Sequence, residues 1–351
     1  MLLYLHIPFC DSKCFYCSFN SYVDKLRYKK EYMKAVIRQF DFEAKKYGLK
    51  KGSLRTLFIG GGTPSTIEPE LYIPFFKNLS IYFDDNIEIT TEANPNSATL
   101  EWIKGMRNLG VNRMSFGVQS FDDKKLKYLG RNHTSKSAIK AIENAYNAGI
   151  NNISLDIIHD TKIDTKKLLK NDINIAKNLP INHISSYSLG IEKGTKFYDT
   201  KEVAKDDISE QKWFYKEIEY AGFPRYEVSN FGKYICKHNV GYWEHKDYIG
   251  IGAGAVGFKK NRRFYPHRDI KKYISNPLYQ KVENISQIEL KEEKVFLGLR
   301  SFVGFERKIL NKKENTKVDV LLKEKKVMQK NGKIYNLEYL LSDEIALFIL
   351  E

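Results

Sequence analysis

Three cysteines near the start of the sequence are the residues whose spacing most directly indicates chemistry. Cys10, Cys14 and Cys17 follow the run Leu5-His-Ile-Pro-Phe with the spacing C-x3-C-x2-C. Iron–sulfur clusters are normally held by one Cys thiolate per iron, so three thiolates leave one iron of a [4Fe-4S] cluster without a protein ligand. The spacing therefore predicts a [4Fe-4S] cluster with one iron open to a further ligand.

Two other interpretations of the cysteines are a disulfide and a structural zinc site. A disulfide would leave one thiol unpaired and needs an oxidising compartment. The sequence shows neither a signal-peptide pattern nor an apolar run of the roughly 18 residues that span a membrane, so we expect a reducing, cytoplasmic location. Zinc takes four closed ligands, and His6 or Cys236 could supply the fourth, but neither two C-x2-C pairs nor a Cys2His2 pattern is present.

The composition bounds the size of the fold and the charge of its partners. With 351 residues, 42% of them hydrophobic, the chain can form one large domain or a core with an appendage. The 58 Lys and Arg against 43 Asp and Glu give a net charge of +15, which favours anionic partners, including an anionic membrane surface in peripheral contact. Much of the excess is single lysines, as in residues 162–177, which is typical of a solvated surface and argues against a nucleic-acid partner.

Apolar and β-branched runs alternate with amphipathic stretches through the first two thirds of the chain. The predicted strands are Leu2–Ile7, Leu54–Ile59, Ile87–Thr91, Val111–Val118, Ile153–Ile158 and His183–Leu189. The predicted helices between and after them are Arg27–Tyr47, Glu68–Phe83, Thr99–Leu109, Ser135–Ala148 and Thr165–Ala176. About six βα units with short connections predict a parallel α/β sheet, either doubly wound or a full or partial barrel.

Unusual residues follow the predicted strands at their carboxyl ends, where ligands bind in such folds. Gly60-Gly61-Gly62-Thr63-Pro64 follows the second strand, and Glu92, Gln119 and Asp156 stand at or near the ends of the next three. The glycines are either a tight turn or a place where a ligand approaches the backbone. Each carboxylate is equally well a ribose or amine ligand, a helix cap or an ion-pair partner. Together with the cysteines, these residues predict one shared pocket.

The sequence pattern changes after about residue 205, and this change predicts three regions. Residues 1–205 form the core, and residues 285–351 form a helical domain with a β-wing. Between them, residues 206–284 form an aromatic- and glycine-rich extension that ends in a basic linker at 259–284. The last region shows a helical stretch at Glu289–Leu299 and a hairpin signal at Asn331-Gly332. Gly250–Gly257 is similar to G-x-G-x-x-G, but it opens no βαβ unit, so we do not assign a dinucleotide site there.

Several motifs together resemble one family over almost the whole chain. Besides the cysteines and the glycine turn, they are Asn112-Arg-Met-Ser-Phe-Gly-Val-Gln-Ser-Phe121, Leu129-Gly-Arg-Asn-His133 and Tyr226-Glu-Val-Ser-Asn-Phe231. They resemble radical S-adenosylmethionine (SAM) proteins of the oxygen-independent coproporphyrinogen III oxidase type. The resemblance implies a partial (β/α)6 TIM-like barrel, a [4Fe-4S] cluster and SAM bound to the open iron. It also implies that SAM is surrounded by Tyr4, Tyr16, Gly61, Gly62, Thr63, Glu92, Gln119, Arg131 and Asp156.

Two departures from the decarboxylating oxidases point to a different branch of the family. The oxidases have a further cysteine where this chain has Phe19, and an extension before the cluster cysteines, whereas here nine residues precede Cys10. Cys17-Ser-Phe-Asn-Ser-Tyr22 and His238-Asn-Val-Gly-Tyr-Trp243 instead resemble the heme-chaperone branch. We therefore expect a protein that binds the cluster, SAM and heme and delivers heme to heme-receiving proteins. An oxygen-independent coproporphyrinogen III oxidase is the alternative, and an RNA-modifying radical SAM enzyme, suggested only by the charge, is a weaker one.

His238 is the candidate heme ligand, because neutral imidazole is an ordinary iron donor and aromatic residues surround it in the sequence. A purely structural histidine is the competing interpretation, and His245, Cys236 or Tyr242 could ligate the iron instead.

One loop departs from the family pattern. After Ile158 the family usually shows an Ile-x-Gly-Leu-Pro turn, whereas this chain has Ile158-His-Asp-Thr-Lys-Ile163. His159 is either a surface residue or a contact to the second ligand, and we expect the former.

Overall fold

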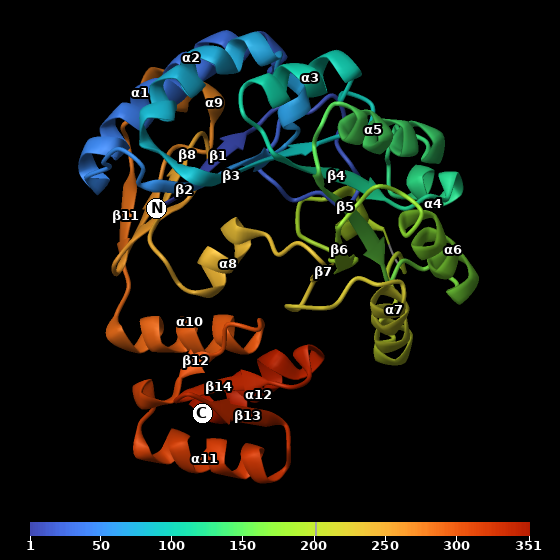
Figure 1. Cartoon of the computed structure of the whole chain (residues 1–351), viewed down its shortest axis with the longest axis vertical. Helices are drawn as coiled ribbons and strands as arrows, with labels where there is room; N and C mark the ends of the chain where they lie inside the picture. Colours follow the sequence, from blue (N-terminus) through green and yellow to red (C-terminus); the bar gives the residue numbers. More distant parts are fainter. Residues whose placement is uncertain (201) are drawn as a thin grey trace.

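The computed structural model describes residues 1–200 and 202–351 and gathers most strands into one strongly curved sheet (Figure 1). The strands in order across this sheet are β11 (Lys281–Asn284), β10 (Arg262–Tyr265), β9 (Gly257–Lys259), β8 (Tyr248–Ile251), β1 (Leu2–Ile7), β2 (Leu54–Gly61), β3 (Phe83–Ala93), β4 (Arg113–Gln119), β5 (Asn152–His159), β6 (His183–Ser188) and β7 (Asn230–Gly232). Strands β1 to β6 are parallel and adjacent in chain order. The predicted partial barrel is therefore confirmed, and all six predicted core strands are present.

Helices cover the convex side of the arch (Figure 1). They are α1 (Lys29–Tyr47), α2 (Pro69–Leu79), α3 (Leu100–Asn108), α4 (Asp123–Tyr128), α5 (Ser135–Asn147), α6 (Lys166–Ala176) and α7 (Ile208–Tyr220). In α3 the Thr99 side chain caps the first turn by accepting from Trp102 N, and Trp102, Ile103 and Met106 turn into the core at helical spacing. Among the described residues, no helix is both long and apolar enough to cross a bilayer.

The structure corrects the expectation of a basic linker at 259–284. This segment forms β10, α9 (Ile270–Ser275) and β11, and single apolar side chains such as Phe264, Ile270 and Tyr273 are buried. Elements of four to six residues with at most two buried positions show no measurable period, so the many surrounding charges hid them. The aromatic- and glycine-rich stretch before it supplies β8, which pairs in parallel with β1, and α8 (Lys237–Trp243), which lies beneath the concave face of the sheet (Figure 1).

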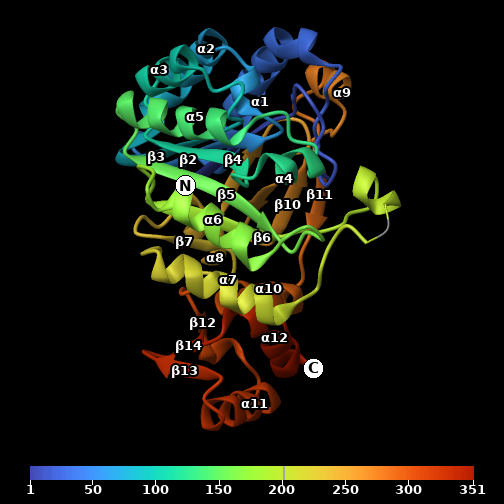
Figure 2. The same ribbon diagram turned by 90° about the vertical axis from the view of Figure 1, so that its right-hand side faces the viewer.

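The last part of the chain packs around a second apolar core that includes Val295, Phe305, Val318 and Ile334. Its elements are α10 (Gln287–Leu299), β12 (Phe305–Glu306), α11 (Lys312–Lys323), β13 (Val327–Lys330), β14 (Lys333–Asn336) and α12 (Ser342–Leu350). The predicted helix and hairpin are confirmed, since Asn331 and Gly332 both have positive φ, at 51° and 77°, as a two-residue turn of type I′ requires. Figure 2 shows these elements below the sheet, on the side of α8.

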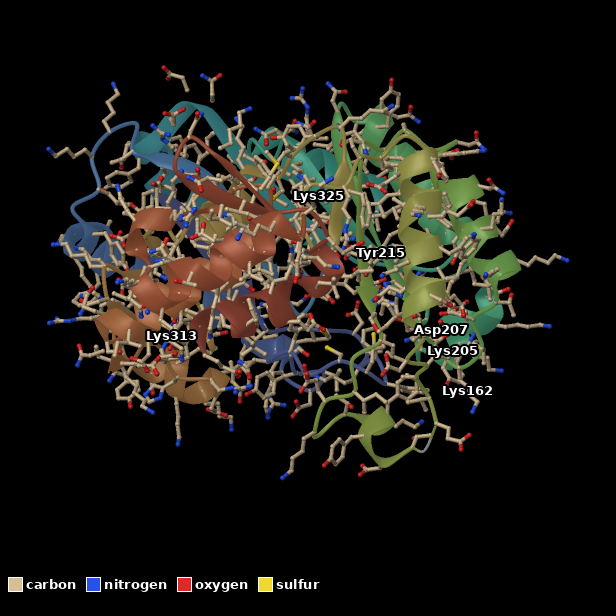
Figure 3. All side chains as sticks on the ribbon, turned by 90° about the horizontal axis from the view of Figure 1, so that it is seen from below. Lys162, Lys205, Asp207, Tyr215, Lys313 and Lys325 are labelled. Atoms are coloured by element: carbon tan, nitrogen blue, oxygen red, sulfur yellow. The ribbon has the colours of Figure 1, made fainter. Side chains whose placement is uncertain are left out.

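His159, the last residue of β5, is buried, whereas we expected it at the surface. Its Nε2 lies 3.1 Å from the hydroxyl of Tyr215, which α7 supplies (Figure 3), and its Nδ1 lies 3.0 Å from Asp160. Asp160 stands where the family turn has glycine and has a φ of 63°. Because Asp tolerates the left-handed conformation better than most residues, the chain keeps the turn without the glycine.

Behind this loop, a buried ion pair connects α4 to β5 and to the loop that follows β5. The ammonium of Lys125 is fully buried, lies 2.7 Å from Asp164 and donates to the carbonyl of Ile158 at 2.6 Å. Removing one member of such a pair leaves an uncompensated charge in a medium of low dielectric.

We predict that Lys125→Met lowers the free energy of unfolding by about 3–5 kcal/mol, because Asp164 would remain buried without its counter-ion. Denaturant titration followed by circular dichroism measures this change. Lys124→Met, at the exposed neighbouring position, is the matched control and should change it by less than about 0.5 kcal/mol. Equal effects of the two variants would contradict the assignment of Lys125 to the core.

Candidate cofactor site

The three cysteines lie on the loop that follows β1, and the glycine turn after β2 holds this loop. The parallel pairing of β1 and β2 continues past both strands, because Gly62 N donates to Ile7 O and Thr63 N donates to Phe9 O, both at 2.7 Å. The backbone that leads into Cys10 is thus fixed by the turn after the second strand.

The close approach of the two loops explains the glycines. A Cβ at Gly62 would lie 2.7 Å from the carbonyl oxygen of Phe9 and 3.0 Å from Cys10 Sγ. Gly61 has a φ of 115°, and a Cβ there would overlap the ring of His6. The glycine turn is therefore required by the cysteine loop, in addition to exposing backbone to a ligand.

The segment Leu129-Gly130-Arg131 holds the other side of the cysteine loop. Phe15 N donates to Leu129 O at 3.1 Å, and a Cβ at Gly130 would lie 2.6 Å from the Phe15 ring. Arg131 donates from Nη1 to Cys14 Sγ at 3.1 Å and from Nη2 to the carbonyl of Gly117 at 2.6 Å. The guanidinium thus lies beside one of the predicted cluster sulfurs.

The donor set fits a [4Fe-4S] cluster. All three thiols are free; Cys10 is buried, which raises the pKa of its thiol, while Cys14 and Cys17 are half-buried. Cys10 Sγ accepts a hydrogen bond from Thr63 and Cys14 Sγ accepts one from Arg131, and hydrogen bonds of this kind set the potential of a cluster. In the described part of the chain, no three His, Cys, Asp or Glu side chains converge on one point. A cubane does not need such convergence, because each thiolate binds a different iron.

Two carboxyl groups face the interior of the arch beyond the cysteines. Burial, and then the proximity of Asp156, raises the pKa of Glu92 to about 7, and burial raises that of Asp156 to about 6. Glu92 accepts a hydrogen bond from Gly61 N at 3.1 Å, and Ser115 donates to Asp156 at 3.4 Å. Two confined acids of this kind favour a cationic ligand between them, because a positive charge offsets the cost of ionising them. The sulfonium and ammonium of SAM are such charges.

The SAM residues implied by the resemblance are brought together. Tyr4, Glu92 and Asp156 lie on strands of the sheet, and their inward-facing side chains stay partly accessible. The hydroxyl of Tyr4 lies within hydrogen-bond distance of His6 Nδ1, at 2.9 Å. Gln119, at a φ of 68°, directs Nε2 toward the same glycine, Gly117, whose carbonyl binds Arg131. The remaining members, Tyr16, Gly61, Gly62 and Thr63, belong to the two loops described above. Their direct contact with SAM stays a prediction.

Sequence reasoning missed several polar residues that surround this interior. Ser185 on β6 lies beside Asp156 and limits the rise of its pKa, and Arg113 on β4 is buried near both carboxylates. Glu227 is buried, and this raises its pKa to about 7. A signal existed in β6, which reads His-Ile-Ser-Ser-Tyr-Ser, because strands of a parallel sheet that is buried on both faces are usually apolar throughout.

His238 lies away from this site, at the other end of the strands. Its Nδ1 is 2.7 Å from Thr56 Oγ1 in the first half of β2, four residues before Gly60, which is about 13 Å along a strand. Its Nε2 is 2.9 Å from the hydroxyl of Tyr242, and the residue is 1% exposed. Cys236, another candidate ligand, is fully buried, and its thiol faces Glu88.

Glu88 holds α8 in this place. It is buried on β3 and accepts hydrogen bonds from Lys237 N at 2.9 Å and His238 N at 3.0 Å, at the start of the helix, and from the Tyr234 hydroxyl at 2.9 Å. An anion at a helix amino terminus satisfies donors that have no partner within the helix.

Comparisons with known proteins agree with this geometry. The model of the radical SAM superfamily matches residues 4–170, which include the cysteine loop, the glycine turn and both carboxylates. The structure of coproporphyrinogen III oxidase (HemN) from Escherichia coli, a radical SAM enzyme, aligns with a TM-score of 0.81 over 99% of this chain and 89% of that one, at 18% identity. The fold and the site thus define a radical SAM protein, and membership of this superfamily implies a [4Fe-4S] cluster and SAM.

Curated relatives show which family within the radical SAM superfamily this chain resembles. The heme chaperone HemW of Bacillus subtilis is 34% identical over 95% of this chain and 93% of its own length, and that of Haemophilus influenzae is 36% identical over 82% and 79%. This chain belongs to the heme chaperone HemW family within the radical SAM superfamily.

We predict that Gly62→Ala reduces the iron and sulfide bound per chain after anaerobic reconstitution to a small fraction of the wild-type value, because the added methyl group would collide with Phe9 O and Cys10 Sγ. Gly190→Ala is the control, since a Cβ there meets nothing within 4 Å. Full loading of the Gly62 variant would show that the contact between the two loops does not position the cysteines.

A second prediction concerns the pH dependence of SAM binding. Glu92, whose pKa is raised to about 7, faces Asp156, Arg113, Tyr4 and Tyr187. The carboxyl is neutral below this pH and anionic above it, so the affinity of the cluster-loaded chain for cationic SAM should rise about tenfold between pH 6 and 8. Equilibrium dialysis at a series of pH values measures this affinity.

In Glu92→Gln the hydrogen-bond acceptor for Gly61 is kept but the charge is lost, so the rise in SAM affinity between pH 6 and 8 should disappear. Any slope that remains belongs to Asp156 or to the ligand. A slope equal to that of the wild type would exclude Glu92 as the titrating group.

Proposed function

We propose that this chain is a heme chaperone of the radical SAM type, which binds a [4Fe-4S] cluster, SAM and heme and delivers the heme to acceptor proteins. The observation that carries the proposal is the 34% identity to a heme chaperone over 95% of this chain and 93% of that relative. A likeness over this length includes the segment around α8, beyond residues 4–170 that the superfamily model matches.

The surroundings of His238 support its role as the heme ligand. Burial, and then the charge of Arg113, lowers the pKa of His238 to about 3, so the imidazole stays neutral and keeps a lone pair for iron at any physiological pH. Thr56 orients the ring through Nδ1, as partners on the second nitrogen do for metal-binding histidines. Nε2 is the donor left for iron.

Tyr242 competes for that donor. Its hydroxyl lies 2.9 Å from Nε2 of His238, one helical turn earlier on α8, so iron reaches this nitrogen only when the hydroxyl moves away. The same hydroxyl can return to Nε2 when the heme leaves, so that the imidazole is not left buried without a partner. We therefore assign Tyr242 a role in both the uptake and the release of heme.

The alternative functions have less support. The similarity to HemN, at 18% identity, establishes the fold alone. Phe19, which stands where the oxidases carry a further cysteine, is 66% exposed and offers no equivalent ligand. No contact in the described structure favours RNA over other anions. The proposal places the protein in the cytoplasm, and the charge of +15 supports a peripheral contact with an anionic membrane.

The test is to load the chain anaerobically with cluster and heme and to follow heme transfer to a heme-free b-type cytochrome by absorption spectroscopy. We expect wild-type transfer, weakened heme binding in His238→Ala because the iron loses its nitrogen ligand, and tighter binding with slower transfer in Tyr242→Phe because Nε2 becomes free. Tyr220→Phe, at an exposed position, is the matched control.

Three outcomes would contradict these assignments. Wild-type protein that binds no heme would exclude the chaperone function. Unchanged heme spectra in His238→Ala would move the ligand elsewhere. Repeated turnover of coproporphyrinogen III to the divinyl product by the cluster-loaded chain with SAM and a reductant would make the protein an oxidase.

A further inference from the structure

Residues 190–200, which we call the cap segment, leave the body of the fold after β6 and reach the cysteine loop. Figure 2 shows this segment, in yellow-green, projecting from one side of the arch. Thr195 and Phe197 are its only buried residues, and the others are exposed. A segment with so little buried surface opens easily, so its place in the fold depends on the contacts of these few residues.

The base of the cap segment is attached to the end of β5 and to the loop that follows. Leu189 N donates to the carbonyl of His159 at 2.9 Å before the segment begins. Lys205 N donates to the carbonyl of Asp160 at 2.7 Å where the chain returns. Both attachments lie at the carboxyl end of the parallel sheet, which is the end that carries the cysteine loop.

The tip of the cap segment binds Phe15, which stands between Cys14 and Cys17 in the sequence. Phe197 N donates to Phe15 O at 3.0 Å, and the two rings meet edge to face with their centroids 5.9 Å apart. The ammonium of Lys196 lies 3.8 Å from the centroid of the Phe15 ring. The cysteine loop is thus contacted by both the backbone and the side chains of the tip.

These contacts form a small apolar core that is separate from the main core of the sheet. Phe15 and Tyr16 of the cysteine loop pack against its buried members, which are Leu129, Ile158, Leu189, Phe197 and Val203. Leu129 and Gly130 hold Phe15 on one side, as described above, and Phe197 adds a contact from a segment about 180 positions later. Removal of the Phe197 ring would therefore open this small core and leave the main core intact.

We propose that the cap segment shields the cysteine loop from solvent when the [4Fe-4S] cluster is bound, and that Phe197 is the positioning residue that holds it there through Phe15. Cys14 and Cys17 are only half-buried. Their side of the loop therefore needs a cover from elsewhere in the chain if water is to be excluded from the cluster. Solvent exposure is one of the factors that set the potential of such a cluster. This role rests on the cluster alone and not on the delivery of heme.

The test compares Phe197→Ala with Tyr198→Ala, a matched control at the next position, which is 54% exposed. Both variants should take up the wild-type amount of iron and sulfide in anaerobic reconstitution, because the glycine turn still holds the loop. The ferrous chelator ferrozine should then remove iron from dithionite-reduced Phe197→Ala about tenfold faster or more than from the wild type, because the ring that fills the small core is lost. Tyr198→Ala should lose iron at the wild-type rate.

The reduction potential of the cluster, from a titration followed by electron paramagnetic resonance, distinguishes shielding from mere packing. In Phe197→Ala it should become more positive, because water stabilises the more negatively charged reduced cluster. Phe197→Leu keeps an apolar side chain and should restore most of the wild-type potential and of the slow iron loss.

Hydrogen exchange in the wild type gives a measurement that needs no variant. If the cap segment and the cluster stabilise each other, amide exchange in residues 195–199, followed by mass spectrometry, should slow when the cluster is bound. Equal exchange with and without the cluster, or equal iron loss from Phe197→Ala and Tyr198→Ala, would overturn the proposal. An unchanged potential in Phe197→Ala would make Phe197 a purely structural residue. None of these outcomes changes the expected binding and transfer of heme, so the proposed function would stand.

Discussion

The backbone contact between the cysteine loop and the glycine turn after β2 is the constraint on which the candidate cofactor site depends. The hydrogen bonds from Gly62 N and Thr63 N extend the parallel ladder past the end of β2, first to Ile7 at the end of β1 and then to Phe9 beyond it. A loop with three thiols would otherwise be mobile, and its ordering would cost conformational entropy when the cluster binds. Because the ladder continues, the position of Cys10 is fixed by the core of the sheet. The same contact requires residues without side chains, which is why the turn is glycine-rich.

At the amino ends of its strands, the parallel sheet also positions helix α8. Glu88 on β3 draws the start of α8 beneath the arch by accepting its first amide protons, and Thr56 on β2 binds the imidazole that the helix carries. The two groups of residues are thus supported by the same strands but separated along them. A change at α8 that leaves β2 in place would leave the cysteine loop in place as well, so a movement of this helix does not require the cofactor site at the other end to be rebuilt.

The core of the fold could be predicted from the sequence because β1 to β6 and their helices are long enough to show a period, and the positions of Glu92, Gln119 and Asp156 followed from the rule for strand ends. The short elements at 259–284 were missed because Phe264 or Ile270 alone establishes no period. The placement of α8 was also beyond the sequence, since it depends on one carboxylate, Glu88, that is 149 positions away from the amide of Lys237. His159 was misplaced because its burial depends on Tyr215, which α7 brings from later in the chain.

The two ends of the strands also differ in charge, and this difference bears on what each end can hold. At the carboxyl ends, Glu92 and Asp156 are confined acids with raised pKa values, an environment that binding of a cation relieves. At the amino ends, Arg55 and Lys237 stand beside apolar side chains with no carboxylate partner in the described structure, an environment that suits an anion. Because these preferences are opposite, a ligand that suits one end of the strands is poorly suited to the other end.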